Sequence, residues 1–99
     1  MPLFVLTCLD KPNSLEVRMA AREDHIAYVR EHYAAGRVKL GGPFLDADGQ
    51  MCGSNLVIEV EDMAAAKAFS AADPYAKAGL FQSVDIRAFR VVTGGFEQK

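Results

Sequence analysis

Apolar residues gather in four short runs that have the length and composition of β-strands. Residues 2–9 are apolar at odd and even positions alike, which is typical of a central strand covered on both faces. Residues 37–45 and 55–60 form two further runs, and the turn sequence Asp46-Ala-Asp-Gly49 predicts a hairpin between them. The last run, residues 81–92, alternates apolar and polar positions, so one face of this strand should be buried.

Two segments between these strands have helical spacing, residues 15–36 and residues 63–72. Asn13 and Asp62 are the expected N-caps, and Glu16 occupies the capping-box position of the first helix. Residues that end a helix or a turn close both segments: Gly36 is the last residue of the first, and Pro74 and Gly79 follow the second.

The resulting order is βαββαβ, so we predict an α+β protein with a ferredoxin-like fold. This fold is a four-stranded antiparallel sheet with its helices on one face. Because the strand at residues 2–9 is apolar on both sides, the face without helices should also carry apolar side chains. A second copy of the chain is the simplest cover for that face, and we therefore expect a homodimer.

A polar row runs along the apolar side of the first predicted helix. Steps of four, three and four residues place these positions on one line: Arg18, Arg22, His25 and Val29. Burying unpaired charge is costly, so plain packing does not explain this row. The row is understandable if it lines a cavity, and the sequence therefore predicts a site along this helix.

Composition narrows the class of protein. A chain of 99 residues suits a single domain, residues 1–99, with a loose tail at residues 93–99. The net charge of −2 gives no basic footprint for nucleic acid. No apolar run approaches the roughly 20 residues of a membrane helix, and the first residues lack a secretion signal. Cys8 and Cys52 lack metal-site or redox spacing, so we expect a reduced, cytoplasmic protein without nucleic-acid or membrane partners.

Several short motifs, taken in order, resemble the YciI-like family of small α+β proteins. They are Arg22-Glu-Asp-His-Ile-Ala-Tyr28, Gly36-Arg-Val38, Gly42-Pro43, Asp73-Pro-Tyr75, Ala78-Gly-Leu-Phe81 and Val84-Asp-Ile86. The resemblance implies a dimeric α+β barrel, in which two sheets pack face to face, and a pocket holding a pair made by His25 and Asp73. One similar protein removes chloride from a chlorinated hydroxyquinol, and muconolactone isomerases share the architecture. Where the family often has a proline-aromatic step, this chain has Ala88-Phe89, away from the pair.

The pair implied by the resemblance suits general acid–base catalysis. An imidazole exchanges protons near neutral pH, and a carboxylate on its other nitrogen orients the ring and stabilises its charged form. The alternative for His25 is a core histidine bonded to a backbone carbonyl. The alternative for Asp73 is an N-cap followed by proline, and a carboxylate with two oxygens can cap and pair at once.

Further residues are candidates for binding a substrate. Arg22 and, less directly, Arg18 can bind an anionic group, or both can extend to solvent and pair with acidic residues. Gly42 and Pro43 lie in a strand that the sequence Gly41-Gly-Pro43 interrupts, where the glycines permit a bulge or the close approach of a ligand. Tyr75 can line the pocket or serve in packing.

Other site types find little support. Ser54 can line the pocket, but no nucleophile elbow surrounds it. His32 lies about 10 Å from His25 along the helix, too far to share one metal ion, and we expect it in solvent or at an interface. The acidic turn at residues 46–49 does not fit a calcium loop, and no phosphate or dinucleotide motif occurs. We therefore expect neither a metal nor a cofactor.

These observations predict a cofactor-free lyase, such as a dehydrochlorinase, or an isomerase that acts on a small, anionic or aromatic-derived molecule. His25 would be the general acid or base, Asp73 its orienting partner, and Arg22 the anion contact, with Gly42 and Pro43 shaping the pocket wall. Two alternatives remain open. One is a non-catalytic dimer that binds a metabolite or regulates another protein, and the other is a cofactor-free monooxygenase.

Overall fold

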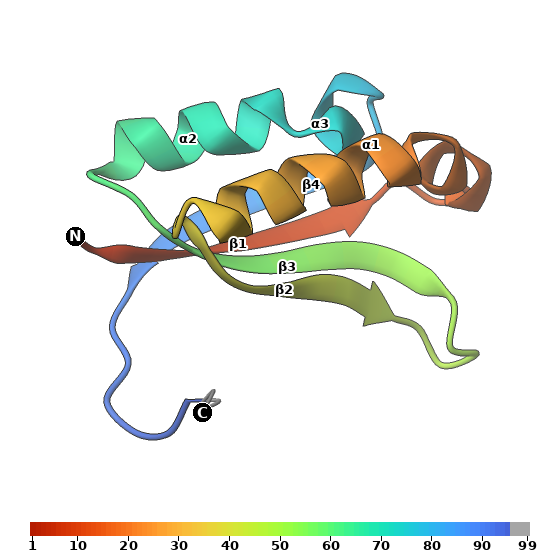
Figure 1. The fold of residues 1–99 in the computed structure, drawn as a ribbon. Helices are drawn as coiled ribbons and strands as arrows, with labels where there is room; N and C mark the ends of the chain where they lie inside the picture. The colour runs from red at the N-terminus through yellow and green to blue at the C-terminus, as the bar shows by residue number, and fades with distance from the viewer. Residues whose placement is uncertain (96–99) are drawn as a thin grey trace.

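The computed structural model describes residues 1–95 and has the predicted order of elements (Figure 1). The elements are β1 (Leu3–Asp10), α1 (Leu15–Ala34), β2 (Val38–Leu45), β3 (Met51–Glu59), α2 (Met63–Ala72), α3 (Pro74–Lys77) and β4 (Phe81–Phe89). The four strands form one antiparallel sheet in the order β2-β3-β1-β4. The helices lie together on one face of this sheet, so the ferredoxin-like prediction is confirmed.

The first strand is central, as its composition predicts. In β1, Leu6 pairs with Leu56 of β3 on one side and with Ile86 of β4 on the other. Alternate side chains of β1, Phe4, Leu6 and Cys8, are buried beneath the helices. The core that they begin continues through the following buried residues: Val38, Leu56, Ile58, Val60, Ala66 and Phe69.

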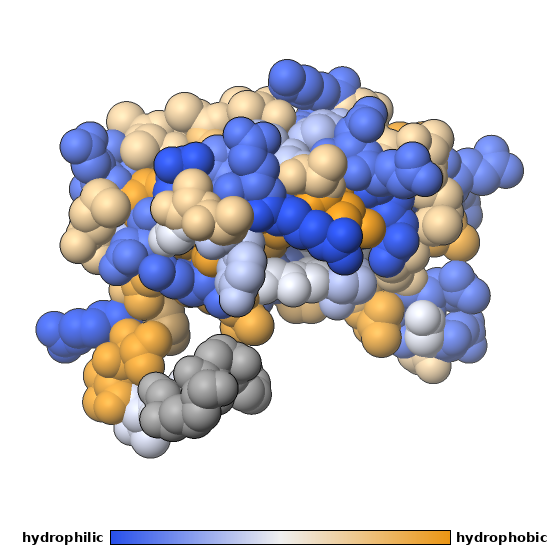
Figure 2. All heavy atoms as spheres, in the orientation of Figure 1, coloured by the Kyte–Doolittle hydropathy of each residue, from blue (hydrophilic) through white to orange (hydrophobic). Residues whose placement is uncertain are grey.

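The opposite face of the sheet carries apolar side chains that are open in this chain. Leu9, Leu40 and Phe89 are each 48 to 49% exposed. They occupy three different strands, so the apolar character extends across the sheet. Figure 2 shows the side of the molecule on which α1 lies, where hydrophilic side chains have apolar atoms between them. The helix α1 also exposes apolar side chains, among them Leu15, Val17 and Met19.

The start of α1 corrects one prediction. Asn13 is not the N-cap, because it adopts a left-handed conformation (φ 57°) in the preceding turn. Ser14 takes the cap position, and its hydroxyl donates to the Pro12 carbonyl rather than capping the helix. Asp62 does cap α2, accepting the Ala65 N–H at 2.8 Å. Gly36 has the positive φ (85°) expected of a residue that follows a helix.

Two strand boundaries differ from the predictions by more than one residue. β3 starts at Met51 and not at residue 55, because the Asp46 carboxylate accepts the N–H groups of Asp48 and Gln50 and closes the turn early. β4 ends at Phe89 and not at residue 92, because Phe89 already pairs with Leu3, the first residue of β1. Of the tail predicted at residues 93–99, residues 96–99 lie outside the described residues. None of the helices in residues 1–95 is long and apolar enough to cross a membrane.

Candidate active site

His25 and Asp73 meet in the folded chain although 48 residues separate them. His25 comes from the middle of α1, and Asp73 lies in the step between α2 and α3. The His25 Nδ1 atom lies 2.8 Å from the Asp73 Oδ1 atom. Because a carboxylate only accepts hydrogen bonds, the hydrogen of the imidazole resides on Nδ1. The Nε2 atom is then the ring nitrogen that can accept a proton. None of residues 1–95 forms a hydrogen bond with Nε2.

Local sequence holds the carboxylate in place. Pro74 is the first residue of α3 and keeps Asp73 in extended geometry (φ −62°, ψ 129°). Asp73 Oδ1 also accepts the N–H of Tyr75 at 2.9 Å, so this carboxylate caps α3 and pairs with His25 at once. Asp73 is buried, and the same oxygen, Oδ1, accepts both of its hydrogen bonds. The capping and pairing roles that the sequence left as alternatives therefore coexist.

Tyr75 packs against the imidazole. Its ring stacks on that of His25 with 3.9 Å between centroids and 16° between planes. The Arg18 guanidinium lies over the same ring, 4.5 Å from its centroid. Burial raises the pKa of the Tyr75 phenol, while Arg18 and Arg22 act in the opposite direction. Tyr75 is a neutral, fully buried wall of the site that fixes the plane of His25.

Arg18 is buried rather than extended to solvent. Its guanidinium donates to both carboxylate oxygens of Asp10, at 2.8 and 3.0 Å, and to the Ser54 hydroxyl at 2.9 Å. Burial disfavours its charge, but the bonds and the charge of Asp10 outweigh this and raise its pKa. Arg18 therefore keeps its charge, which Asp10 balances, and it serves as a structural hydrogen-bond donor at one end of the site. Ser54 accepts from it and keeps a hydroxyl hydrogen to offer elsewhere.

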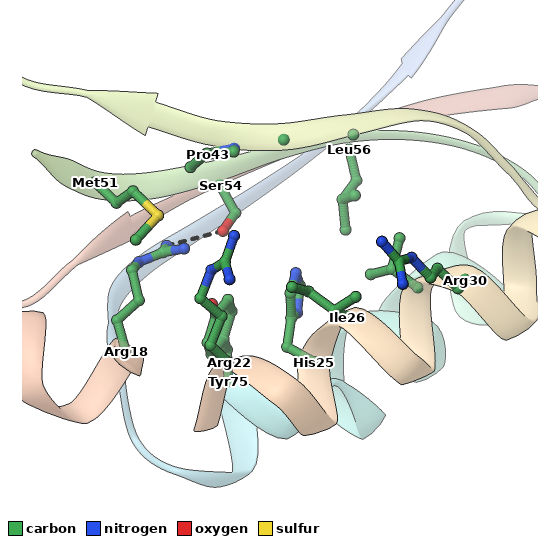
Figure 3. Close-up of a pocket in the computed structure, with 13 residues that line it drawn as sticks. Arg18, Arg22, His25, Ile26, Arg30, Pro43, Met51, Ser54, Leu56 and Tyr75 are labelled. Atoms are coloured by element: carbon green, nitrogen blue, oxygen red, sulfur yellow. Dashed lines mark hydrogen bonds between the residues drawn. The ribbon is translucent and has the colours of Figure 1, made fainter. Parts of the chain in front are cut away.

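A cavity of about 230 Å³ lies between α1 and the β2-β3 half of the sheet (Figure 3). This volume is just below the roughly 300–1,000 Å³ of pockets for drug-sized ligands, so it suits a smaller molecule. Its lining comprises Arg18, Arg22, His25, Ile26, Val29, Arg30, Gly41, Gly42, Pro43, Met51, Ser54, Leu56 and Tyr75. Every binding residue proposed from the sequence lies on this wall, and Asp73 stands behind His25.

The glycines of β2 do not form a bulge, which is one of the two alternatives that the sequence leaves open. The strand runs without a break through Gly41, Gly42 and Pro43, and its register shifts instead next to Val38 and next to Leu45. A side chain at Gly41 would overlap Leu56 of the neighbouring strand, whereas Gly42 has open space beside it. The close-approach alternative therefore fits better, because bare backbone at these positions keeps the cavity open.

Cys8 lies close to the site but is unsuited to nucleophilic chemistry. It pairs with Ser54 across the sheet and is buried. Burial, and after it the charge of Asp73, raises the pKa of its thiol to about 12. The thiol therefore stays protonated at neutral pH. Cys52 is also a free thiol.

Sequence reasoning missed several residues of the wall. Arg30 lies outside the polar row, and its only signal is that it follows Arg22 by eight residues, which is two steps of four along α1. Met51 was missed because the predicted strand began four residues later. Ile26, Val29 and Leu56 have the apolar character of ordinary core residues, so nothing in the sequence marks them as facing a cavity.

Comparisons with known proteins bear on this site. Residues 2–90 match the family model of the YCII-related domain. An uncharacterized protein of Haemophilus influenzae is 34% identical over 95 residues, which cover 90% of this chain and 97% of that protein. Protein YciI of Escherichia coli is 33% identical over 96 residues, covering 91% of this chain and 98% of the relative.

Solved structures extend the likeness. A 5-chloro-2-hydroxyhydroquinone dehydrochlorinase from Burkholderia phenoliruptrix, in complex with 2,5-dihydroxybenzoquinone, has a TM-score of 0.82 and 34% identity. The match covers 89% of this chain and 93% of that one. An antibiotic biosynthesis monooxygenase has a TM-score of 0.56 at 13% identity, covering 94% of this chain and 100% of the other. The second likeness concerns the fold alone.

Proposed function

The chain belongs to the YCII-related domain family, and we propose that it is a cofactor-independent enzyme of the lyase type. The similarity to a dehydrochlorinase at 34% identity supports elimination as its reaction. A small organic molecule is the substrate class that fits a cavity of about 230 Å³.

The observation that carries the proposal is the placing of His25 between a buried carboxylate and an open cavity. Asp73 holds Nδ1 at 2.8 Å, and the ring lines the cavity beside Arg22 (Figure 3). In this role His25 is the general base, and Asp73 orients it and stabilises the imidazolium that forms. Arg22 binds or polarises an anionic group, and Gly42 and Pro43 form the facing wall.

In the proposed elimination, neutral His25 accepts a proton from the substrate at Nε2. The electron pair left behind forms a new π bond, and the leaving group departs as an anion with its own electron pair. The imidazolium then releases the proton to water. No external oxidant or reductant is needed, because the proton and the leaving anion together account for what the substrate loses.

We further propose that the working form is a homodimer. The face of the sheet opposite the helices exposes about half of the surface of Leu9, Leu40 and Phe89, and a second copy would cover it as a dimeric α+β barrel. Two free cysteines fit a reducing compartment, and we place the protein in the cytoplasm. Light scattering of the purified protein checks the dimer.

Chloride release from 5-chloro-2-hydroxyhydroquinone and other chlorinated phenols tests the proposed reaction. His25→Gln should lower the rate by about 10²–10⁴-fold, since that is the usual contribution of a general base. His32→Gln on the same helix is the matched control and should stay within a few-fold of the parent chain. Circular dichroism checks that both variants fold. A folded His25→Gln variant with the parent rate would contradict the proposal.

A further inference from the structure

Two of the three arginines on the cavity wall have no acidic partner. Arg18 is neutralised by Asp10, but no ion pair joins Arg22 or Arg30 to any carboxylate within residues 1–95. No aspartate or glutamate lines the cavity. The chain as a whole has a net charge of −2, so this wall is a local positive region on an acidic protein.

The helix itself offers these two arginines no compensation. Side chains three and four residues apart on a helix are neighbours, and acidic residues at those positions usually balance an arginine. The neighbours of Arg22 are Arg18, Met19, His25 and Ile26. The neighbours of Arg30 are Ile26, Ala27, Tyr33 and Ala34. Neither set contains a carboxylate, so both guanidinium groups are available to an anionic ligand.

The two arginines lie on opposite sides of His25. Along the axis of α1, Arg22 precedes His25 by about 4.5 Å and Arg30 follows it by about 7.5 Å. Figure 3 shows the two guanidinium groups in the cavity with His25 between them. The facing wall offers Pro43 and Leu56, which carry no charge. A ligand that reaches both arginines therefore spans the stretch of the cavity wall that His25 and Ile26 line.

We propose that the substrate carries an anionic group at each end, one bound by Arg22 and the other by Arg30, with the reacting atoms between them. The substrate class is a small dianion, either a dicarboxylate or a ring that carries an acidic oxygen at each end. Arg30 is then a specificity residue, because it separates dianions from monoanions, while Arg22 binds the anion nearer to His25. This inference rests on the proposed function, since it uses the same cavity and the same base.

Binding of adipate and hexanoate tests this arrangement, because both have six carbons and they differ by one carboxylate. Calorimetry on the full chain should show adipate bound at least about tenfold more tightly, as a second charge-assisted contact implies. Arg30→Gln should remove that preference and leave hexanoate affinity unchanged, and Arg30→Lys should restore part of it. Arg22→Gln should weaken both ligands. Arg87→Gln, which changes an exposed arginine paired with Asp85 on β4, is the control and should change neither.

Equal affinities for adipate and hexanoate would overturn the inference. An Arg30→Gln variant that weakens both ligands alike, or neither of them, would also overturn it. The same titrations on His25→Gln separate the two proposals, because binding does not require the base. Retained adipate preference in a variant that still turns over substrate at the parent rate would refute the catalytic role of His25 but leave the substrate class intact.

Discussion

Two histidines on the same helix have opposite environments. His25 and His32 lie two turns apart on α1, and both are partly buried. The Nδ1 atom of His25 faces the Asp73 carboxylate at 2.8 Å. The Nδ1 atom of His32 accepts a hydrogen bond from Arg37 Nε at 2.7 Å. A carboxylate stabilises a protonated ring, whereas an arginine requires a neutral one, so the partner decides what each imidazole can do.

Their neighbours reinforce the difference. His25 stacks flat on Tyr75 and lines the cavity. His32 makes edge contacts with Tyr28 and Phe69, at centroid distances of 4.5 and 5.0 Å, and does not line the cavity. Within this chain His32 is partly buried and packs between α1 and α2, so it is not simply solvated, and its place at an interface stays a prediction. The comparison shows that position on a helix alone does not separate the histidine that we propose as catalytic from a histidine that serves in packing.

Replacing the hydrogen-bond partner of each histidine should give the largest difference in activity between the two. Asp73→Asn replaces the acceptor at Nδ1 with an amide that can donate, so the ring loses its tautomer and its charge stabilisation. We expect kcat/KM to fall by about 10²–10⁴-fold. Arg37→Gln should leave kcat/KM within about twofold. Steady-state kinetics on both variants checks this, and equal losses would mean that the two histidines are not functionally distinct.

The pH dependence of the free energy of unfolding should include a contribution from the protonation of His32. Burial, and after it the charge of Arg37, lowers the pKa of His32 below its ordinary value of 6.5. The native state therefore binds fewer protons than the unfolded chain, and this contribution to stability is present above pH 6.5 and is lost as the pH falls. Urea denaturation from pH 7.5 to pH 4.5 measures it.

The matched variant for this measurement is His32→Gln, whose amide oxygen can still accept from Arg37. It should be about 1–2 kcal/mol less stable near neutral pH, because ring packing is lost. Its stability should also fall less than that of the parent chain as the medium becomes acidic. A parallel decline in both proteins would show that His32 does not contribute.

The smallest effect is expected at Tyr28, which lies on α1 between the two histidines. Its hydroxyl donates to the Phe69 carbonyl at 2.7 Å. Tyr28→Phe should lower the free energy of unfolding by about 1 kcal/mol without changing kcat/KM. Burial, and then the charge of Asp73, raises the pKa of Tyr28 from 10.0 to about 12. The parent chain should therefore lose this contribution as the pH rises from 10.0 to about 12.

Urea denaturation at pH 8 and at pH 11 distinguishes these expectations. Tyr33→Phe is the control, since the Tyr33 side chain is 62% exposed, and it should behave like the parent chain at both values. A loss of stability at pH 11 that is as large in Tyr28→Phe as in the parent chain would assign the alkaline transition to another group.

Part of the site could be predicted because its signals are local, whereas the pairing of His25 with Asp73 was expected only from the resemblance to the YciI-like family. The spacing of Arg18, Arg22 and His25 reflects the period of a helix, and Pro74 marks the turn that presents Asp73. Spacing does not predict which of these charged groups is paired with another charge. Arg18 and Arg22 look alike in the sequence, yet only Arg18 meets Asp10, since the pairing depends on how the end of β1 meets the start of α1.

The sequence by itself determined the order of the strands and helices, the central place of β1 and the side of α1 that faces the sheet. These features follow from apolar periodicity and turn residues, which act over a few neighbours along the chain. Only the tertiary structure decided that Arg30 joins the cavity, that His32 is held by Arg37, and that Gly41 makes room for Leu56. The reason is physical, because charge pairing and close packing depend on distances in space, and these are set only when separate elements come together.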